Sequence, residues 1–177
     1  MKKKQHKSGL PPGSVVFTGN QKVDKVVVHY LQFDEKRLSE ETFDNHNDLT
    51  FHASAEEQID WYDVRGLHDV KLIEAIGQTF NIHPLILEDV ANVNQRPKYE
   101  EYERGDFIAL KALNFDKTSL EVKTEQVTLY FRDGLVLTFQ ETESDLFSSF
   151  ASAFTMAEEK FGKKGLTTLP MQLWTPS

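Results

Sequence analysis

Two neighbouring segments, residues 127–131 (VTLYF) and 135–139 (LVLTF), carry apolar side chains on both faces of an extended chain. Asp133-Gly134 between them suits a two-residue hairpin turn, because both residue types tolerate positive φ. A strand that is apolar on both faces is buried on both faces, which requires layers of structure above and below its sheet. The pair therefore restricts the chain to a layered fold around a central sheet.

Strand and helix patterns alternate along the rest of the chain. β-Rich or alternating segments predict strands at 15–17, 25–33, 37–43, 59–64, 106–114 and 121–131, with a polar loop and one helical turn over 44–58. Helical spacing predicts a helix capped by Asp69 and ending at Phe80, a short one from Pro84, and an apolar stripe from Phe147 to Phe161 that Gly162 ends. These elements predict the α/β class, as an αβα sandwich with a mixed parallel/antiparallel sheet between helical layers.

Composition limits the function classes. A chain of 177 residues with 39% hydrophobic residues and thirteen phenylalanines suits one packed domain. The formal net charge is −8, and since four lysines lie within residues 1–7, the remainder carries −12. This acidic body argues against nucleic acid as a partner and favours cations. The absence of cysteine excludes disulfides and thiolate metal sites.

Signatures of catalysis are missing from the sequence. It has no phosphate-binding glycine loop, no G-x-S-x-G elbow and no cysteine nucleophile. The polar run that begins at Asp44 has Leu49 where a calcium loop needs glycine and Ala55 where it needs glutamate. The run Tyr99–Glu103 reads as an edge loop or exposed strand. We therefore expect a protein that is not an enzyme.

The segment 81–90 (NIHPLILEDV) carries an adjacent pair of acids, Glu88 and Asp89. Pro84 suits the first helical position, and the predicted buried side consists of Ile82, Leu85, Ile86, Leu87 and Val90. The two acids fall off that side, roughly 100° apart on the helix, where each can offer oxygens to a ligand or a docked surface. From the residues alone, such a pair is more often a solvated surface than a site.

The run His83–Asp89, followed by Gln95-Arg96-Pro97-Lys98, resembles the signature of the cytoplasmic domain of CorA-type magnesium transporters. Three further motifs agree in order and spacing: Gly9–Gly13, Glu125-Gln126-Val127 and Val136–Glu141. The resemblance implies the same αβα fold and a cytoplasmic domain over residues 9–162. We expect residues 1–8 to be a disordered basic tail. Residues 163–177 depart from the family pattern after Gly165, and we expect an atypical or truncated tail without the membrane domain.

The resemblance also implies a function. In this family a long stalk helix, two membrane helices and a Gly-Met-Asn motif follow the domain, and five subunits form a ring. The implied function is to sense cytosolic Mg²⁺ and gate the pore of a homopentamer in the cell inner membrane, with this domain on the cytoplasmic side. Glu88 and Asp89 would form one half of a regulatory metal site facing the stalk helix of a neighbouring identical subunit. Mg²⁺ would be both the regulatory and the transported ion, with Co²⁺ as a second candidate.

Two alternatives stay open at this point. The first is the cytoplasmic domain of a transporter for zinc or another divalent metal of the same superfamily, because the motifs do not specify the ion. The second is a scaffold that has this fold and transports nothing. No apolar run in the sequence approaches the eighteen or so residues that span a bilayer, so we expect these residues not to cross a membrane themselves.

Overall fold

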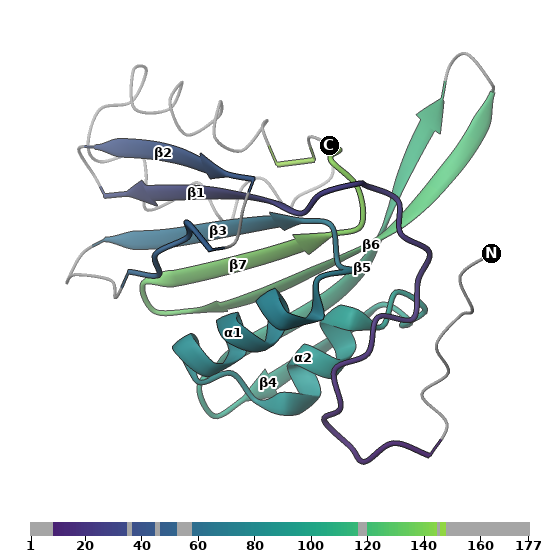
Figure 1. Ribbon diagram of the computed structural model, residues 1–177, viewed down its shortest axis with the longest axis horizontal. Coiled ribbons are helices and arrows are strands. Elements are labelled where there is room, and N and C mark those ends of the chain that lie inside the picture. Colours follow the sequence, from purple (N-terminus) through teal and green to yellow (C-terminus); the bar gives the residue numbers. More distant parts are fainter. Residues whose placement is uncertain are drawn as a thin grey trace.

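A seven-stranded mixed sheet forms the centre of the chain in the computed structural model, which describes residues 9–34, 37–44, 47–52, 58–116, 120–144 and 146–147 (Figure 1). The strands are β1 (Val27–Phe33), β2 (Leu38–Phe43), β3 (Ile59–Arg65), β4 (Lys98–Tyr102), β5 (Gly105–Asp116), β6 (Glu121–Arg132) and β7 (Leu135–Gln140). Their order across the sheet is β2-β1-β3-β7-β6-β5-β4. Within this sheet β3 and β7 run parallel and the other neighbours antiparallel, which confirms the predicted mixed sheet.

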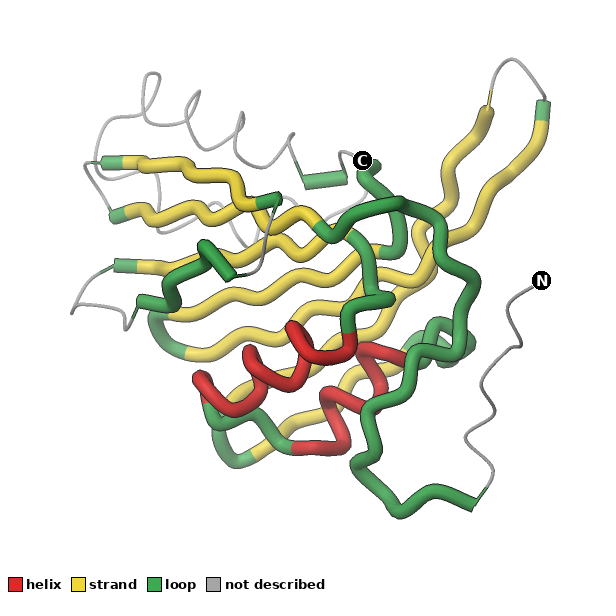
Figure 2. The backbone as a smooth tube through the Cα atoms, in the orientation of Figure 1, coloured by secondary structure: helices red, strands yellow, loops and turns green. Residues whose placement is uncertain are grey.

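Two helices, α1 (Val70–Phe80) and α2 (Pro84–Ala91), connect β3 to β4 and cover one face of the sheet (Figure 2). The predicted cap of α1 is confirmed, because the side chain of Asp69 accepts a hydrogen bond of 3.1 Å from the backbone N–H of Leu72. Asn81 ends α1 in the left-handed conformation, at φ 51°. Pro84 stands in the first turn of α2, as its fixed φ and missing N–H favour.

The main core lies between these helices and the sheet. Its most deeply buried side chains are Val28, Tyr62, Val64, Ile73, Ile76, Ile86, Val90, Phe107, Leu137 and Phe139. Side chains on the opposite face of the sheet, such as Val127 and Thr138, are buried too, and Phe147 packs edge-on against Trp61. The two-sided burial that the sequence predicted is therefore present. Apart from Phe147, the predicted helix over 147–161 lies outside the described residues, as do both predicted tails.

Residues 9–26, here called the N-terminal strap, form neither helix nor strand, so the strand predicted at 15–17 is wrong. The strap runs beside α2 before it enters β1 (Figure 2). The backbone N–H of Thr18 donates to the carbonyl of Ala91, 3.1 Å away, and the Lys22 ammonium lies 2.9 Å from the Glu141 carboxylate. The apolar residues at 15 and 17 pack against the core without joining the sheet.

Three smaller predictions concern loops and edges. Residues 99–103 were expected to be an edge loop or an exposed strand, and β4 is indeed an edge strand. The helical turn expected within 44–58 is absent from the described part of that range, residues 44, 47–52 and 58. The hairpin turn at Asp133-Gly134 is confirmed between β6 and β7, with Gly134 at φ 72°.

The hairpin of β5 and β6 extends past the rest of the sheet (Figure 1). Phe115 pairs directly with Val122 across the two strands, so both side chains lie on one face of this ribbon, and Leu113 follows on the same face. All three are largely exposed. The end of the hairpin thus presents apolar side chains to solvent.

Candidate functional site

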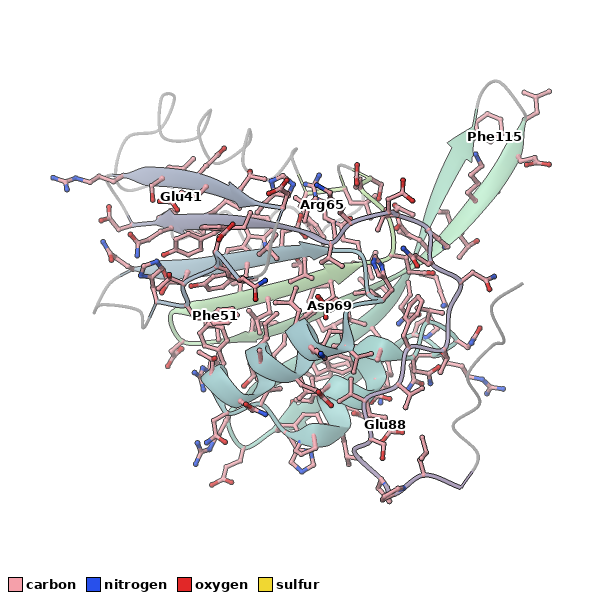
Figure 3. The ribbon with its side chains drawn as sticks, in the orientation of Figure 1. Glu41, Phe51, Arg65, Asp69, Glu88 and Phe115 are labelled. Atoms are coloured by element: carbon pink, nitrogen blue, oxygen red, sulfur yellow. The ribbon has the colours of Figure 1, made fainter. Side chains whose placement is uncertain are left out.

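The motifs around the acid pair come together in the fold. The strap crosses α2 on one side, and the segment 95–98 returns along its other side into β4. Glu88 projects from α2 toward the strap (Figure 3). Its Oε2 accepts a hydrogen bond of 2.6 Å from the backbone N–H of Gly13. Residues 75 positions apart in the sequence are therefore joined by one of the two predicted site carboxylates.

Gly13 has a structural reason for being glycine. Its φ is +83°, which side-chain-bearing residues rarely adopt, and an added Cβ would lie 2.9 Å from the Cβ of Pro84. The close approach of strap and helix leaves an open hollow of about 260 Å³ beside Glu88. It is lined by Leu10, Pro11, Pro12, Ser14, Leu85 and Glu88.

Asp89 does not lie on the open side of α2, and this part of the sequence prediction is wrong. The residue is only 8% exposed, whereas Leu85, predicted to be buried, is 39% exposed. One oxygen of Asp89, Oδ2, lies 2.6 Å from the ammonium Nζ of Lys98, and the other, Oδ1, accepts from the side-chain amide of Gln95. Burial of a carboxylate is tolerated here because donors six and nine residues further along the chain pair with it.

Lys98 connects the acid pair to the sheet. Its ammonium lies 3.0 Å from Glu100 Oε1 and 5.6 Å from the centre of the Phe107 ring. Burial favours the neutral amine, but the hydrogen bonds to Asp89 and Glu100 outweigh it, so the pKa of Lys98 is raised above 10.5. The hydrogen bond from Lys98, together with one of 2.8 Å from the Tyr102 hydroxyl, lowers the pKa of Glu100.

A second polar cluster lies in the sheet, and sequence reasoning did not single it out. The side chain of Asp63, 1% exposed, accepts hydrogen bonds from Thr138 Oγ1 at 2.6 Å, from Gln140 Nε2 at 2.8 Å and from Arg65 Nε at 2.8 Å. The sequence pattern of β3 and β7 does not show that the two strands are neighbours, so it could not predict that Asp63 and Thr138 lie side by side. These donors satisfy the carboxylate internally, which indicates a structural role.

The motif at 125–127 also has a structural role. The backbone N–H of Gln126 donates to Glu141 Oε1 at 2.7 Å, and the hydroxyl of Thr142 donates to Glu125 Oε2 at 2.7 Å. With the ion pair between Lys22 and Glu141, these contacts hold the end of β7 to β6 and to the strap.

The donor chemistry at Glu88 fits a hard divalent cation. Mg²⁺ prefers carboxylate oxygens and keeps several waters, and six waters at about 30 Å³ each would fit a hollow of this size. Across the described parts of the chain, no group of three or more histidine, aspartate or glutamate side chains is placed to hold a metal ion. Nor does any helix in those parts have the length and apolar character to cross a membrane.

Comparisons with known proteins identify the family of the chain. The sequence model of the family described as "CorA-like Mg²⁺ transporter protein" matches residues 56–171. Over 142 residues the chain is 39% identical to the cobalt/magnesium transport protein CorA of Thermotoga maritima. The matched region covers 80% of this chain and 40% of that protein. The chain therefore spans less than half the length of this curated relative.

Two solved structures share the fold at low sequence identity. The ZntB cytoplasmic domain from Vibrio parahaemolyticus matches with a TM-score of 0.53 at 13% identity, over 82% of this chain and 55% of that one. The full-length CmaX protein matches with a TM-score of 0.56 at 6% identity, over 75% of this chain and 40% of that one.

Proposed function

Because the chain belongs to the family of CorA-like Mg²⁺ transporter proteins, we propose that it is the regulatory domain of a Mg²⁺ channel or transporter and senses cytosolic Mg²⁺. The observation that carries this proposal is the 39% identity to a cobalt/magnesium transport protein. It supports Mg²⁺, with Co²⁺ as a second ion, over Zn²⁺. The similarity to the ZntB domain concerns the fold alone and does not support zinc as the transported ion.

Glu88 and Asp89 are the proposed ligands of the regulatory ion. Glu88 lines the open hollow, so an ion can reach its carboxylate from solvent while waters fill the remaining coordination positions. Asp89 is adjacent on α2 but is engaged by Lys98 and Gln95. We propose that oxygen ligands from a neighbouring identical subunit complete the site.

A ring of identical subunits, five in our proposal, makes such a site regulatory. The chain has a net charge of −8, and packing acidic domains side by side costs electrostatic energy that carboxylates at the contact increase. Filling the shared sites with divalent cations would offset this repulsion and stabilise the closed ring. When cytosolic Mg²⁺ falls, the ring loosens and the open state of the pore gains population. The pore itself would lie in the membrane part of the complete protein, with this domain on the cytoplasmic side of the inner membrane.

The test is ion flux into liposomes that hold the complete protein, with external Mg²⁺, Co²⁺ or Zn²⁺ and a range of internal Mg²⁺. The proposal predicts Mg²⁺ flux that is inhibited as internal Mg²⁺ rises. Flux of Zn²⁺ without Mg²⁺ would favour a zinc transporter. Flux of none of these ions would favour a scaffold. Mg²⁺ flux that does not depend on the internal Mg²⁺ concentration would refute the sensing role alone.

A further inference from the structure

Both oxygens of Asp89 already accept hydrogen bonds from within the domain. Oδ2 is paired with Lys98 at 2.6 Å, and Oδ1 accepts from Gln95. With the residue only 8% exposed, the surrounding chain covers most of the carboxylate. A divalent cation that binds Asp89 therefore approaches a carboxylate whose charge a neighbouring ammonium neutralises.

The ammonium of Lys98 is held beside Asp89 by more than one contact. Glu100 binds it at 3.0 Å, and the Phe107 ring lies 5.6 Å from it, within the range of an attractive cation–π contact. Its side chain is 26% exposed, so solvent screens the charge only in part.

We propose that Lys98 competes with the divalent cation for Asp89 and thereby sets the Mg²⁺ concentration at which the regulatory site fills. The inference rests on the proposed function of the acid pair and adds to it the residue that tunes its affinity. A tethered ammonium repels an incoming Mg²⁺ and must share or release an oxygen of Asp89 before that ion is coordinated. The site then stays empty at low Mg²⁺ and fills only when the ion is abundant, as a sensor of cytosolic Mg²⁺ requires.

If Lys98 competes with Mg²⁺, replacing it should raise the affinity of the site for Mg²⁺, whereas replacing a merely structural lysine should not. In Lys98→Gln the positive charge is gone while a hydrogen-bond donor remains, so Asp89 should bind Mg²⁺ more tightly. A lysine that only holds the site together would, when replaced, weaken Mg²⁺ binding. Repulsion between one ammonium and a divalent ion at a partly screened site corresponds to about a tenfold change in affinity.

The chain offers a matched control in Lys22. This lysine also pairs with a buried carboxylate, Glu141, at 2.9 Å, and its side chain is 34% exposed. Lys22→Gln therefore removes the same charge from a similar ion pair away from the acid pair. The double variant Asp89→Asn/Lys98→Gln tests whether any increase in Mg²⁺ affinity depends on Asp89.

The experiment titrates MgCl₂ into the complete protein in detergent and follows the thermal unfolding temperature at fixed ionic strength. The quantity compared is the free Mg²⁺ concentration that gives half of the maximal stabilisation. We expect Lys98→Gln to lower this midpoint about tenfold, Lys22→Gln to leave it within about twofold, and the double variant to lose the gain. Should Lys98→Gln not fold, Lys98→Arg retains the charge and can bind the carboxylate through two N–H groups, so its midpoint should lie at or above that of the wild type.

The outcomes separate this inference from the proposed function. If Mg²⁺ stabilises the wild type but Lys98→Gln has the midpoint of Lys22→Gln or a higher one, the competition by Lys98 is refuted and the sensing role stands. A gain that survives in the double variant, or a Lys98→Arg midpoint well below that of the wild type, refutes it as well. If Mg²⁺ fails to stabilise the wild type, the sensing role fails and the inference with it.

Discussion

Leu87 of α2 fills the space in which a side chain at Gly77 of α1 would have to lie. A Cβ built at Gly77 would overlap the end of the Leu87 side chain, and both residues are buried. Since Glu88 and Asp89 follow Leu87 directly, this helix contact also fixes where the acid pair stands. The position of the candidate site thus depends on a glycine that lies outside it.

Gly77→Ala should destabilise the domain by about 1–2 kcal/mol. Overpacking costs about 1–3 kcal/mol, and the better helix propensity of alanine returns up to about 1 kcal/mol. Urea unfolding of the chain measures the loss. The double variant Gly77→Ala/Leu87→Ala serves as the control, because the smaller residue at 87 makes room for the new methyl group. The double variant should be more stable than the sum of the losses in Gly77→Ala and Leu87→Ala predicts. If the two losses simply add, the contact between residues 77 and 87 is contradicted.

Asp63→Ala should cost about 3–5 kcal/mol, because the fully buried amide of Gln140 loses its acceptor and the half-buried guanidinium of Arg65 loses its hydrogen bond to Asp63. Asp44→Ala is the comparison, since that aspartate is 70% exposed and lies 3.5 Å from Lys25, and it should cost less than about 0.5 kcal/mol. Equal losses in chemical denaturation would show that the Asp63 cluster does not hold β3 to β7.

The contribution of Glu100 to stability should depend on pH. Hydrogen bonds from Lys98 and Tyr102 hold its pKa below 4.5, so the folded state binds this proton less readily than the unfolded state. Its contribution is therefore present above about pH 4.5 and is lost as the pH falls through the folded-state value. The side chain is 39% exposed, which limits the effect to a few tenths of a kcal/mol.

Comparing wild type and Glu100→Gln by urea unfolding between about pH 2 and pH 7 measures this dependence. The difference in the free energy of unfolding should be largest near neutrality and vanish in acid. Glu74→Gln, on the exposed face of α1, removes an equal charge as the control. A Glu100→Gln difference that grows toward low pH would contradict the assignment.

Phe115→Ser at the exposed end of the β5–β6 hairpin should change stability by less than about 0.5 kcal/mol. Phe107→Ala on the same strand, at a fully buried position, should cost about 3–5 kcal/mol. Thermal unfolding of both variants checks the contrast. A large loss in Phe115→Ser would mean that its side chain packs against part of the chain.

Local signals in the sequence predicted the elements that depend on neighbouring residues. The cap by Asp69, the start at Pro84 and the turn at Asp133-Gly134 were confirmed because each is a backbone requirement met within a few residues. The order of strands and the parallel pairing of β3 with β7 depend on contacts between distant segments, and the sequence pattern did not specify them.

The orientation of the acid pair was predicted correctly only for Glu88. Helical periodicity placed Leu85 inside and Asp89 outside, and the structure reverses both. In a helix of eight residues the buried side is decided by what packs against it, here α1, the strap and the segment at 95–98. The sequence signal that could have predicted the burial of Asp89 is the pair of donors Gln95 and Lys98 shortly after it, since both side chains donate to that carboxylate.

The proposed regulatory site is tested most directly by the internal Mg²⁺ concentration that halves Mg²⁺ flux through the complete protein in liposomes. We expect Glu88→Gln/Asp89→Asn to raise this concentration about tenfold or more, because the site loses both charged ligands. Asp44→Asn/Glu74→Gln removes two exposed acids elsewhere and should leave it unchanged. Half-inhibition at the same internal Mg²⁺ in both double variants and in the wild type would contradict a sensor at Glu88 and Asp89.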